Sequence, residues 1–392
     1  MESVLEGVKV VDLSRFIAGP YCSMLLGDMG AEVIKVERTE GDENRFMKPG
    51  VDDLSTYFMM GNRNKRSLTL NFKDPRGKKL LLDLLKDADV VVENFRPGVM
   101  DRLGIGYKDL KAINPGIIMT SISGFGQDGP YSQRPAFDSV AQATGGLMNM
   151  TGDDKPVLAG TWVGDYSAGL YAAFGTMLAL YQRKKTGLGQ QVDIALLDAV
   201  VSWLRTAIPD FLLFGKKHER NGGRNAYHCP IGSFEASNGY VFITAATDSQ
   251  FAGVARAAGH PEWLEDERYN NEPARLANSD VVDGMVLEWT KSLTMDEVLE
   301  KLVAHDVPCA PINDVEQVLA NPQIQYRENV IWTKTNSGKD IPVPGVTVKL
   351  SETPGTVRMG PPSIGEYNEE FFMGQLGMTQ EEYDAYRKEG VI

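Results

Sequence analysis

Cysteine and histidine are both scarce in this chain of 392 residues. The three cysteines, Cys22, Cys229 and Cys309, are odd in number and widely separated. Such spacings predict neither a disulfide framework nor a cysteine metal site, and they favour a reducing compartment. The four histidines are scattered and form no pair with metal-ligand spacing. We therefore expect no metal site.

Long apolar runs and an excess of positive charge are missing too. No stretch of about 18 apolar residues is present, so a membrane-spanning helix is not expected. The N-terminal residues enter a predicted strand without the basic start and apolar core of a signal peptide, and the expected location is the cytoplasm. The formal net charge is −13. This charge argues against a nucleic-acid partner, although a local basic pocket could still bind a small anionic ligand.

Two patterns that suggest other enzyme classes lack the required context. The segment 123–129, SGFGQDG, has the spacing G-x-G-x-x-G after a predicted strand. Pro130 and Pro135 follow it and prevent the helix that would bind a dinucleotide pyrophosphate, so we interpret the segment as a turn. Ser167 does not lie in a G-x-S-x-G motif, and no histidine is placed to form a triad with it. A serine hydrolase is therefore not predicted.

Strand and helix patterns alternate through the first half of the sequence. The expected strands are 8–14, 32–37, 89–95, 116–123 and 191–197, and the helices between or after them include 20–30, 75–88, a long apolar helix from Asp165 to about Gln182, and one that starts at Asp198. This alternation predicts an α/β fold with a parallel sheet.

The composition changes near 215–225, where GKKHERNGGRN is charged and rich in glycine. Beyond it, 232–247 predicts a hairpin that turns at Asn238-Gly239, followed by helices near 248–259 and 295–305, and the chain ends in a helix over 379–390. We therefore expect a large domain from 1–200 and 330–392, a linker over 201–225, and a smaller α+β domain over 226–325.

A single carboxylate, Asp165, stands among small and apolar residues in the segment 159–175, AGTWVGDYSAGLYAAFG. Aspartate is a favoured N-cap of helices, and capping alone explains most such residues. A carboxylate can also act as a covalent nucleophile, and the adjacent Gly164 and Gly169 leave room for a ligand. Both interpretations remain open on composition alone.

Basic residues gather in the segments 62–67 and 93–104. They are Arg63, Lys65, Arg66, Arg96 and Arg102. One interpretation is a solvated basic surface. The other is a phosphate clamp, because the guanidinium fork of arginine matches phosphate oxygens.

Several long motifs in register make the chain similar to the family III CoA-transferases, which include formyl-CoA transferase and carnitine CoA-transferase. The motifs are RFIAGPYCSMLLGDMGAEVIKVE (15–37), NKRSLTLNFKDPRGK (64–78), VVENFRPGVMDRLG (91–104), PAFDSVAQATGG (135–146), GDYSAGLYAAFG (164–175), KTGLGQQVDIALLDAV (185–200) and IGEYNEEFFMGQLG (364–377). The resemblance implies a Rossmann-like large domain with a parallel sheet, a smaller α+β domain, and an interlocked homodimer. It implies an acyl-CoA and a small carboxylic acid as substrates, no tightly bound cofactor, and no nucleic-acid or membrane partner.

The resemblance also assigns roles to single residues. Asp165 falls on the family's nucleophile, which attacks the thioester carbonyl and then carries CoA as an aspartyl-CoA thioester. A helix N-terminus is expected to hold its carboxylate ionised. The resemblance implies Ile17 and Ala18 near the thiol of coenzyme A, Arg38 at the adenine and Arg102 at the diphosphate. Asn94, Phe95 and Arg96 match the stretch along the pantetheine and nucleotide, Leu70 and Lys73 match a further contact segment, and Phe137 is also expected in the site.

An α-methylacyl-CoA racemase of the same fold is the alternative. Racemisation needs two bases on opposite faces of the α-carbon. Racemases of this family have a histidine in the segment that here reads PAFD, and that position is Phe137, which cannot carry a proton. Formyl-CoA transferases have a polar residue where Ile17 stands and a tyrosine at Phe137, so oxalate is not the expected acceptor.

Overall fold

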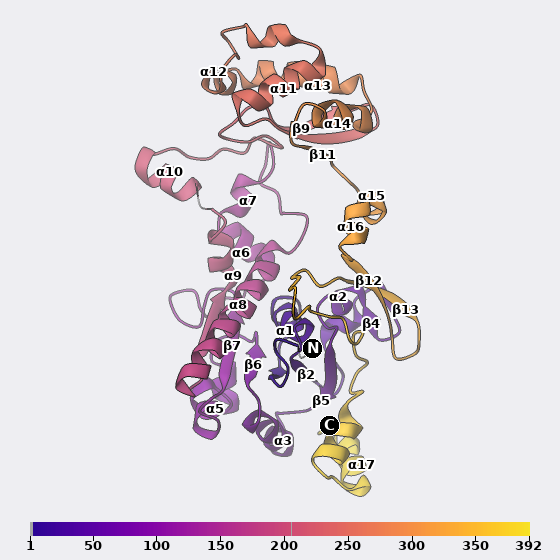
Figure 1. The fold of residues 1–392 in the computed structure, drawn as a ribbon. Helices are drawn as coiled ribbons and strands as arrows, with labels where there is room; N and C mark the ends of the chain where they lie inside the picture. Colours follow the sequence, from indigo (N-terminus) through magenta and orange to yellow (C-terminus); the bar gives the residue numbers. More distant parts are fainter. Residues whose placement is uncertain (1–2, 205) are drawn as a thin grey trace. The chain divides into compact units, whose positions relative to one another are not determined.

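The computed structural model describes residues 3–204 and 206–392. The chain forms two compact units (Figure 1). Unit 1 comprises the described residues of Met1–Leu147, Leu158–Arg205 and Gln323–Ile392, and unit 2 comprises Met148–Val157 and Thr206–Pro322. No helix among the described residues has both the length and the apolar character that crossing a bilayer requires.

Unit 1 is built on a sheet of six parallel strands in the order β5-β2-β1-β6-β7-β8. The strands are β1 Lys9–Asp12, β2 Glu32–Glu37, β5 Lys65–Thr69, β6 Val90–Glu93, β7 Ile118–Ser123 and β8 Gln191–Ala195. The predicted α/β class with a parallel sheet is confirmed. Five of these strands were expected from the sequence, and β5 was not.

The order of the strands reverses between β1 and β6, because the chain builds β1, β2 and β5 in one direction and then β6, β7 and β8 in the other. The loops that leave two such adjacent strands separate and form a crevice at their carboxyl ends. Open parallel sheets bind their ligands in this crevice. The topology therefore predicts a ligand site among the residues that follow Asp12 and Glu93.

Helices cover both faces of the sheet and form two separate cores. One core joins the sheet to α3 (Pro75–Lys86) and α17 (Gln380–Lys388), and the other joins it to α1 (Ala18–Asp28), α8 (Val163–Thr186) and α9 (Leu196–Val201). The other elements of unit 1 are η1 Glu43–Phe46, β3 Gly50–Val51, β4 Leu54–Ser55, α2 Thr56–Met59, α4 Val99–Leu103, α5 Tyr107–Ile113, α6 Asp138–Thr144, β12 Val330–Lys334, β13 Asp340–Pro344 and η3 Glu370–Gln375. Helices α7 (Leu147–Met150) and α16 (Pro322–Tyr326) lie where the two units divide.

Small residues let α8 pack very closely against α1. A Cβ atom on Gly169 would lie 2.6 Å from the carbonyl oxygen of Ala18 and 3.0 Å from the ring of Tyr21. Only a residue without a side chain fits such an approach. This contact brings the N-terminal half of α8, which carries Asp165, next to the first turn of α1.

Strand β5 begins with a buried charge, which explains why the sequence pattern did not reveal it. Lys65 is fully buried, and its Nζ lies 2.8 Å from Asp12 Oδ2, 2.8 Å from the Pro20 carbonyl and 2.9 Å from Asn62 Oδ1. Arg63 is also buried, and its Nη2 lies 2.6 Å from Asp28 Oδ2. Both interpretations of the basic cluster are therefore wrong for these two residues. A buried, paired cation is neither a solvated surface nor available to a phosphate.

Unit 2 contains a three-stranded antiparallel sheet in the order β11-β10-β9 with its own core. Its elements are α10 Ala207–Phe214, β9 Ile231–Ala236, β10 Gly239–Thr244, α11 Asp248–Ala258, η2 Pro261–Leu264, α12 Glu272–Ala277, α13 Ser279–Lys291, α14 Met295–Val303, β11 Cys309–Pro311 and α15 Val315–Ala320. The expected hairpin is present, and its turn is Ser237-Asn238, one residue earlier than predicted. Helix α10 lies in the segment expected to be a linker.

Candidate active site

Two aspartates, Asp138 from α6 and Asp165 from α8, lie at the N-terminus of α8 and differ in their hydrogen bonding. Asp138, the first residue of α6, is 3% exposed and accepts hydrogen bonds through Oδ1 from the backbone N–H groups of Gly164 at 2.7 Å and Asp165 at 3.2 Å. Its Oδ2 accepts a third from Gln142 Nε2 at 2.6 Å. Asp138 thus caps α8 from a different helix, because Trp162, at the N-cap position, provides no side-chain cap. The N-cap interpretation of Asp165 is wrong.

The carboxylate of Asp165 lies in the first turn of α8, partly buried and without a partner. Within residues 3–204 and 206–392, no donor forms a hydrogen bond or ion pair with it. Burial, and secondarily the negative charge of Asp138, raise the pKa of Asp165 to about 7. This direction is opposite to the expected effect of the helix N-terminus. Burial is the main cause, and the backbone N–H groups of Gly164 and Asp165 donate to Asp138 rather than to the Asp165 carboxylate. Buried structural carboxylates are normally hydrogen-bonded, whereas this one has no partner among the described residues, which makes it a candidate functional group.

A strained loop after β1 faces this helix. Phe16 has a φ of 64°, which is uncommon for a bulky residue and costs free energy. Two hydrogen bonds hold the preceding residue, since Arg15 N–H donates to Asn94 Oδ1 at 2.8 Å and Asn94 Nδ2 donates to the Arg15 carbonyl at 2.6 Å. Asn44 Nδ2 donates to the Phe16 carbonyl at 2.9 Å. The loop at the switch point is therefore fixed from both sides.

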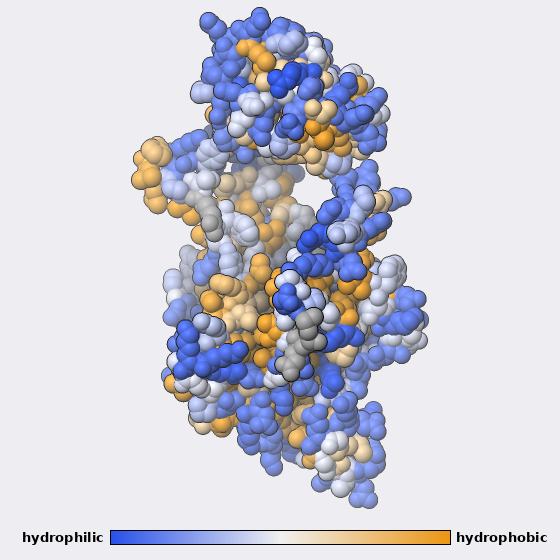
Figure 2. Space-filling view, viewed as in Figure 1, coloured by the Kyte–Doolittle hydropathy of each residue, from blue (hydrophilic) through white to orange (hydrophobic). Residues whose placement is uncertain are grey.

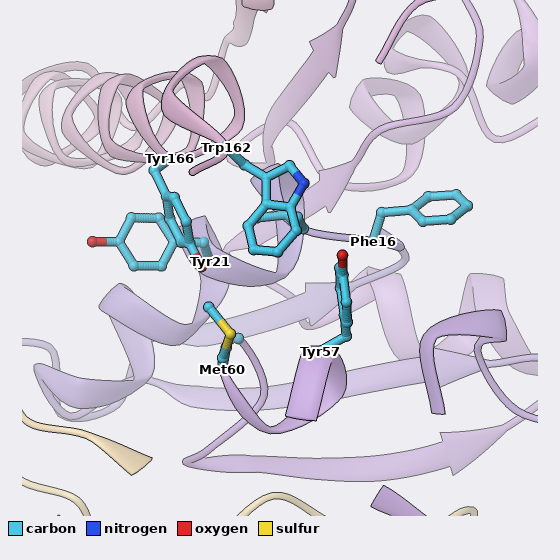
Figure 3. A pocket seen from close by; sticks show the side chains of 8 residues that line it. Phe16, Tyr21, Tyr57, Met60, Trp162 and Tyr166 are labelled. Atoms are coloured by element: carbon cyan, nitrogen blue, oxygen red, sulfur yellow. The ribbon is translucent and has the colours of Figure 1, made fainter. Parts of the chain in front are cut away.

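Aromatic residues surround a small pocket at the N-terminus of α8 (Figure 3). Its lining consists of Phe16, Ile17, Tyr21, Tyr57, Met60, Gly61, Trp162 and Tyr166. Trp162 is the N-cap of α8 and Tyr166 lies in its first turn, on either side of Asp165 in the sequence, and Figure 3 shows the rings of Trp162 and Tyr57 next to each other, in edge contact. Burial, with smaller contributions from Tyr21 and then from the negative charge of Asp165, raises the pKa of Tyr166 to about 12.

A larger cavity of about 680 Å³ lies on the other side of the loop, at the carboxyl ends of the strands around the switch point. Its lining includes Leu13, Ser14, Arg15, Arg38, Leu70, Lys73, Phe95 and Arg96. Ser14 and Arg15 line this cavity, and the next two residues, Phe16 and Ile17, line the aromatic pocket. One loop therefore separates a long cavity from a small apolar pocket.

The lining of the cavity contains more cationic than acidic residues, although the protein as a whole is acidic: Arg15, Lys35, Arg38, Lys73 and Arg96 against Glu37, Glu40 and Asp42. Arg15 and Arg38 share Glu43, at 2.9 Å and 3.1 Å. Among the described residues, the side chains of Lys73 and Arg96 have no ion-pair partner. Unpaired cations at the edge of a cavity provide binding sites for phosphate oxygens.

The structure brings most of the sequence-predicted residues to this region. Arg38, Leu70, Lys73, Phe95 and Arg96 line the cavity, and Ile17 lines the aromatic pocket. Ala18 is the buried first residue of α1, and the side chain of Asn94 holds the loop through Arg15. Phe137 is 63% exposed and packs edge-on against Phe16 at 5.6 Å. Arg102 is exposed and outside the lining of either pocket.

Sequence reasoning missed Asp138 and the aromatic side chains of Phe16, Tyr57, Trp162 and Tyr166. No local signal marks them, because Asp138 caps a helix that begins 25 residues after it, and the aromatic residues come from three separate segments. The segment PAFD contains Asp138, but its position at the start of α6 suggests a role only in its own helix.

Comparison with known proteins assigns the family. The sequence profile described as CoA-transferase family III matches residues 5–368. The β subunit of succinyl-CoA–L-malate CoA-transferase from Chloroflexus aurantiacus is 39% identical over 396 residues, which is 99% of this chain and 98% of that protein. Human succinyl-CoA:glutarate CoA-transferase is 37% identical over 367 residues, 93% of this chain and 84% of that protein.

A solved structure shares the fold. The crystal structure of a CAIB/BAIF family protein from Brucella suis superposes with a TM-score of 0.87 at 35% identity, covering 95% of this chain and all of that one. With its parallel sheet, its cavity at the switch point and a profile match over nearly its whole length, the chain belongs to CoA-transferase family III and is a CoA-transferase.

Proposed function

We propose that the enzyme moves CoA from an acyl-CoA to a free carboxylic acid through a covalent aspartyl-CoA thioester on Asp165. The observation that carries this proposal is the partly buried carboxylate of Asp165, which has no partner among the described residues and precedes Tyr166, a residue that lines an apolar pocket. The alternative racemase needs a second base, and Phe137 cannot supply one.

Each proposed step balances without a proton transfer. The Asp165 carboxylate attacks the thioester carbonyl of the donor, the C–S bond breaks, and CoA leaves as a thiolate from a mixed anhydride. The thiolate then attacks the Asp165 carbonyl carbon, the C–O bond breaks, and the first acid leaves as a carboxylate. The acceptor carboxylate repeats these two steps in reverse order and restores the Asp165 carboxylate.

The site favours this sequence mainly by position. A carboxylate is a weak nucleophile, and holding it against the thioester can supply about 7–11 kcal/mol of the barrier. The raised pKa of Asp165 also indicates poor solvation of its carboxylate, and a poorly solvated anion is a stronger nucleophile. The long cavity would hold the CoA portion, and the aromatic pocket would hold the acyl group.

The proposed CoA cavity leads to a prediction for three arginines. Arg38→Ala and Arg96→Ala should each raise the KM for acyl-CoA about tenfold or more, because a charge-assisted hydrogen bond contributes about 1.5–3 kcal/mol. The KM for the acceptor acid should change much less. Arg102→Ala is the comparison, and because Arg102 lies outside the lining we expect a smaller effect. Steady-state kinetics measure all three, and an unchanged KM for acyl-CoA in both lining variants would mean that CoA binds elsewhere.

We also propose a homodimer, as the family resemblance implies. An exposed apolar stripe on α8, formed by Leu170, Phe174, Met177, Leu178 and Tyr181, supports this proposal. The side chains lie three or four residues apart and so share one face of the helix. A second exposed apolar surface lies on α10 in unit 2, where Leu212, Leu213 and Phe214 are each more than 70% exposed (Figure 2).

Light scattering on the purified enzyme should give twice the mass of the 43.1 kDa chain at micromolar concentration. Exposed apolar patches of this kind mark protein interfaces, so Phe174→Asp should lower the dimer fraction. The exposed Lys388→Asp, on α17, should not change it. An active monomer of the unmodified chain would contradict this part of the proposal.

A further inference from the structure

The loop that follows β1 is held in place by side chains. The Ser14 N–H donates to Asp12 Oδ1 at 2.9 Å, and the Ser14 carbonyl accepts from Lys35 Nζ at 2.9 Å. The side chain of Asn94 bonds both backbone groups of Arg15, as described above. These three side chains come from β1, from β2 and from the residue after β6. Because backbone polar groups need partners away from water, the shape of this loop depends on residues far apart in the chain.

Asn44 holds the strained part of the same loop. Its Nδ2 donates to the Phe16 carbonyl at 2.9 Å, and Phe16 is the residue with a φ of 64°. A bulky residue keeps this left-handed conformation only where the surrounding contacts over-determine it. The hydrogen bond from Asn44 acts directly on the carbonyl of the strained residue, so its loss should allow the loop to relax.

The side chain of Asn44 is fixed in a buried polar network. Asn44 is 1% exposed, and its N–H donates to Asp42 Oδ1 at 3.1 Å. Asp42 forms a buried ion pair with Lys35 at 3.3 Å, and Lys35 donates to the Ser14 carbonyl. This series of contacts leaves the loop at Ser14 and returns to it at Phe16. Asn44 can therefore impose a conformation on Phe16 rather than follow it.

The loop connects the large cavity to the helix that carries Asp165. The two residues before Phe16 line the cavity, and α1 begins two residues after it, at Ala18. The carbonyl of Ala18 lies against Gly169, four residues after Asp165 on α8. The conformation of Phe16 therefore sets how the chain passes from the cavity to α8.

We propose that Asn44 is a positioning residue for CoA transfer, which acts through the Phe16 carbonyl to align a thioester bound in the cavity with the Asp165 carboxylate. The inference rests on the proposed CoA transfer through Asp165 and adds a residue that determines its rate. A displacement of about 1 Å, caused by a substitution far from the reacting atoms, can lower a rate by about 100-fold. The described residues that line the cavity do not include Asn44, so losing its hydrogen bond should slow the reaction without weakening the binding of acyl-CoA.

Steady-state kinetics of Asn44→Ala test this role in the full-length enzyme. Mass spectrometry follows isotope exchange between an acyl-CoA and its own labelled free acid, with whichever of the acetyl, succinyl and 3-phenylpropionyl pairs the unmodified enzyme exchanges fastest. We expect kcat to fall by about tenfold to 100-fold, while the KM for acyl-CoA changes little. The assay temperature is kept below the Tm of each variant.

Asn114→Ala is the matched control. Asn114 Nδ2 also donates to a backbone carbonyl, that of Ala88, at 2.8 Å. Ala88 lies two residues before β6 begins, at the end of the sheet opposite the crevice. This variant loses the same kind of hydrogen bond and should leave kcat and KM unchanged.

Asn44→Asp tests the role independently if Asn44→Ala does not fold. The introduced carboxylate has nearly the same shape as the amide but cannot donate to the Phe16 carbonyl, whereas its protonated form can. The ratio of its kcat to that of the unmodified enzyme should be low at alkaline pH and should rise as the pH falls. If Asn44 served only to stabilise the fold, this ratio would not depend on pH.

The outcomes distinguish this inference from the proposed function. A normal kcat in Asn44→Ala, a KM that rises as much as kcat falls, or an equal loss of kcat in Asn114→Ala would overturn the positioning role while CoA transfer through Asp165 stands. Normal turnover in Asp165→Ala would overturn the proposed function, and this inference would fail with it. The same holds if no pair exchanges and no acyl-CoA leaves an adduct on Asp165.

Discussion

Asp165→Ala is expected to lower the rate of CoA transfer by more than about 10³-fold, the scale of loss when a covalent nucleophile is removed. Without the carboxylate neither the mixed anhydride nor the aspartyl-CoA thioester can form. The measurement is the initial rate of new acyl-CoA formation, followed by mass spectrometry. Turnover near the normal rate would show that the carboxylate is not the nucleophile.

The same variant should remain folded, and the pKa of Asp165 gives the reason. A carboxyl group whose pKa is raised to about 7 by folding destabilises the folded state once it ionises, and this cost develops as the pH rises from about 4 to about 7. Removing it should leave the Tm at pH 8 equal to or above that of the unmodified enzyme. A lower Tm at pH 8 would mean that Asp165 makes stabilising contacts.

Donor alone should trap the enzyme if Asp165 is the nucleophile. Incubation with an acyl-CoA and hydroxylamine, without acceptor, should modify Asp165, seen as a mass change on the peptide that contains GDYSAGLY. A racemase would form no such adduct and would exchange the α-hydrogen of a 2-methylacyl-CoA with deuterated solvent. Deuterium exchange without an adduct would favour the racemase alternative.

Asp138→Ala is expected to have the second-largest effect, a loss of about 2–3 kcal/mol in the free energy of unfolding. The change removes the N-cap of α8 and leaves the buried Gly164 N–H without an acceptor. Loss of a cap costs about 1 kcal/mol, and each unsatisfied buried donor costs about 1–3 kcal/mol. Urea denaturation measures the change. Asp74→Ala, which removes the partly exposed cap of α3, is the control and should cost only about 1 kcal/mol.

Asp138→Asn separates the charge of this residue from its role as a cap. The amide oxygen can still accept from the N–H groups of Gly164 and Asp165, but the negative charge that helps raise the pKa of Asp165 is gone. The pKa of Asp165 should therefore fall, and the acidic limb of the kcat profile should move to lower pH.

A second buried carboxyl group titrates in the same pH range as Asp165, and the comparison of Asp138→Asn with the unmodified enzyme separates the two groups. Burial raises the pKa of Glu93, at the end of β6, to about 7 as well. Glu93 is unchanged in Asp138→Asn, so the difference between the two profiles reports the group beside residue 138. An acidic limb at the same pH in both proteins would mean that Glu93, rather than Asp165, controls it.

The apolar strands were predictable because a short run of apolar residues is itself the local signal of a strand that is buried on both faces. Strand β2, for example, has the predicted bounds 32–37. Strand β5 begins with Lys65 and Arg66, and no local pattern shows that the first of these is buried. Its burial depends on Asp12, which lies 53 residues earlier in the chain. A charge can be paired in the core only by a residue that the fold brings to it.

The sequence by itself determined the parallel α/β architecture. Through the family motifs it also indicated Asp165 as the candidate nucleophile. Hydrophobic periodicity is local, and a long motif can be compared position by position. Only the tertiary structure decided that Asp138 rather than Asp165 caps α8, that the pKa of Asp165 is raised rather than lowered, and that aromatic residues from separate segments form one pocket. These properties depend on distances between residues far apart in the chain. Desolvation and charge repulsion act through space, so they are set only when the chain has folded.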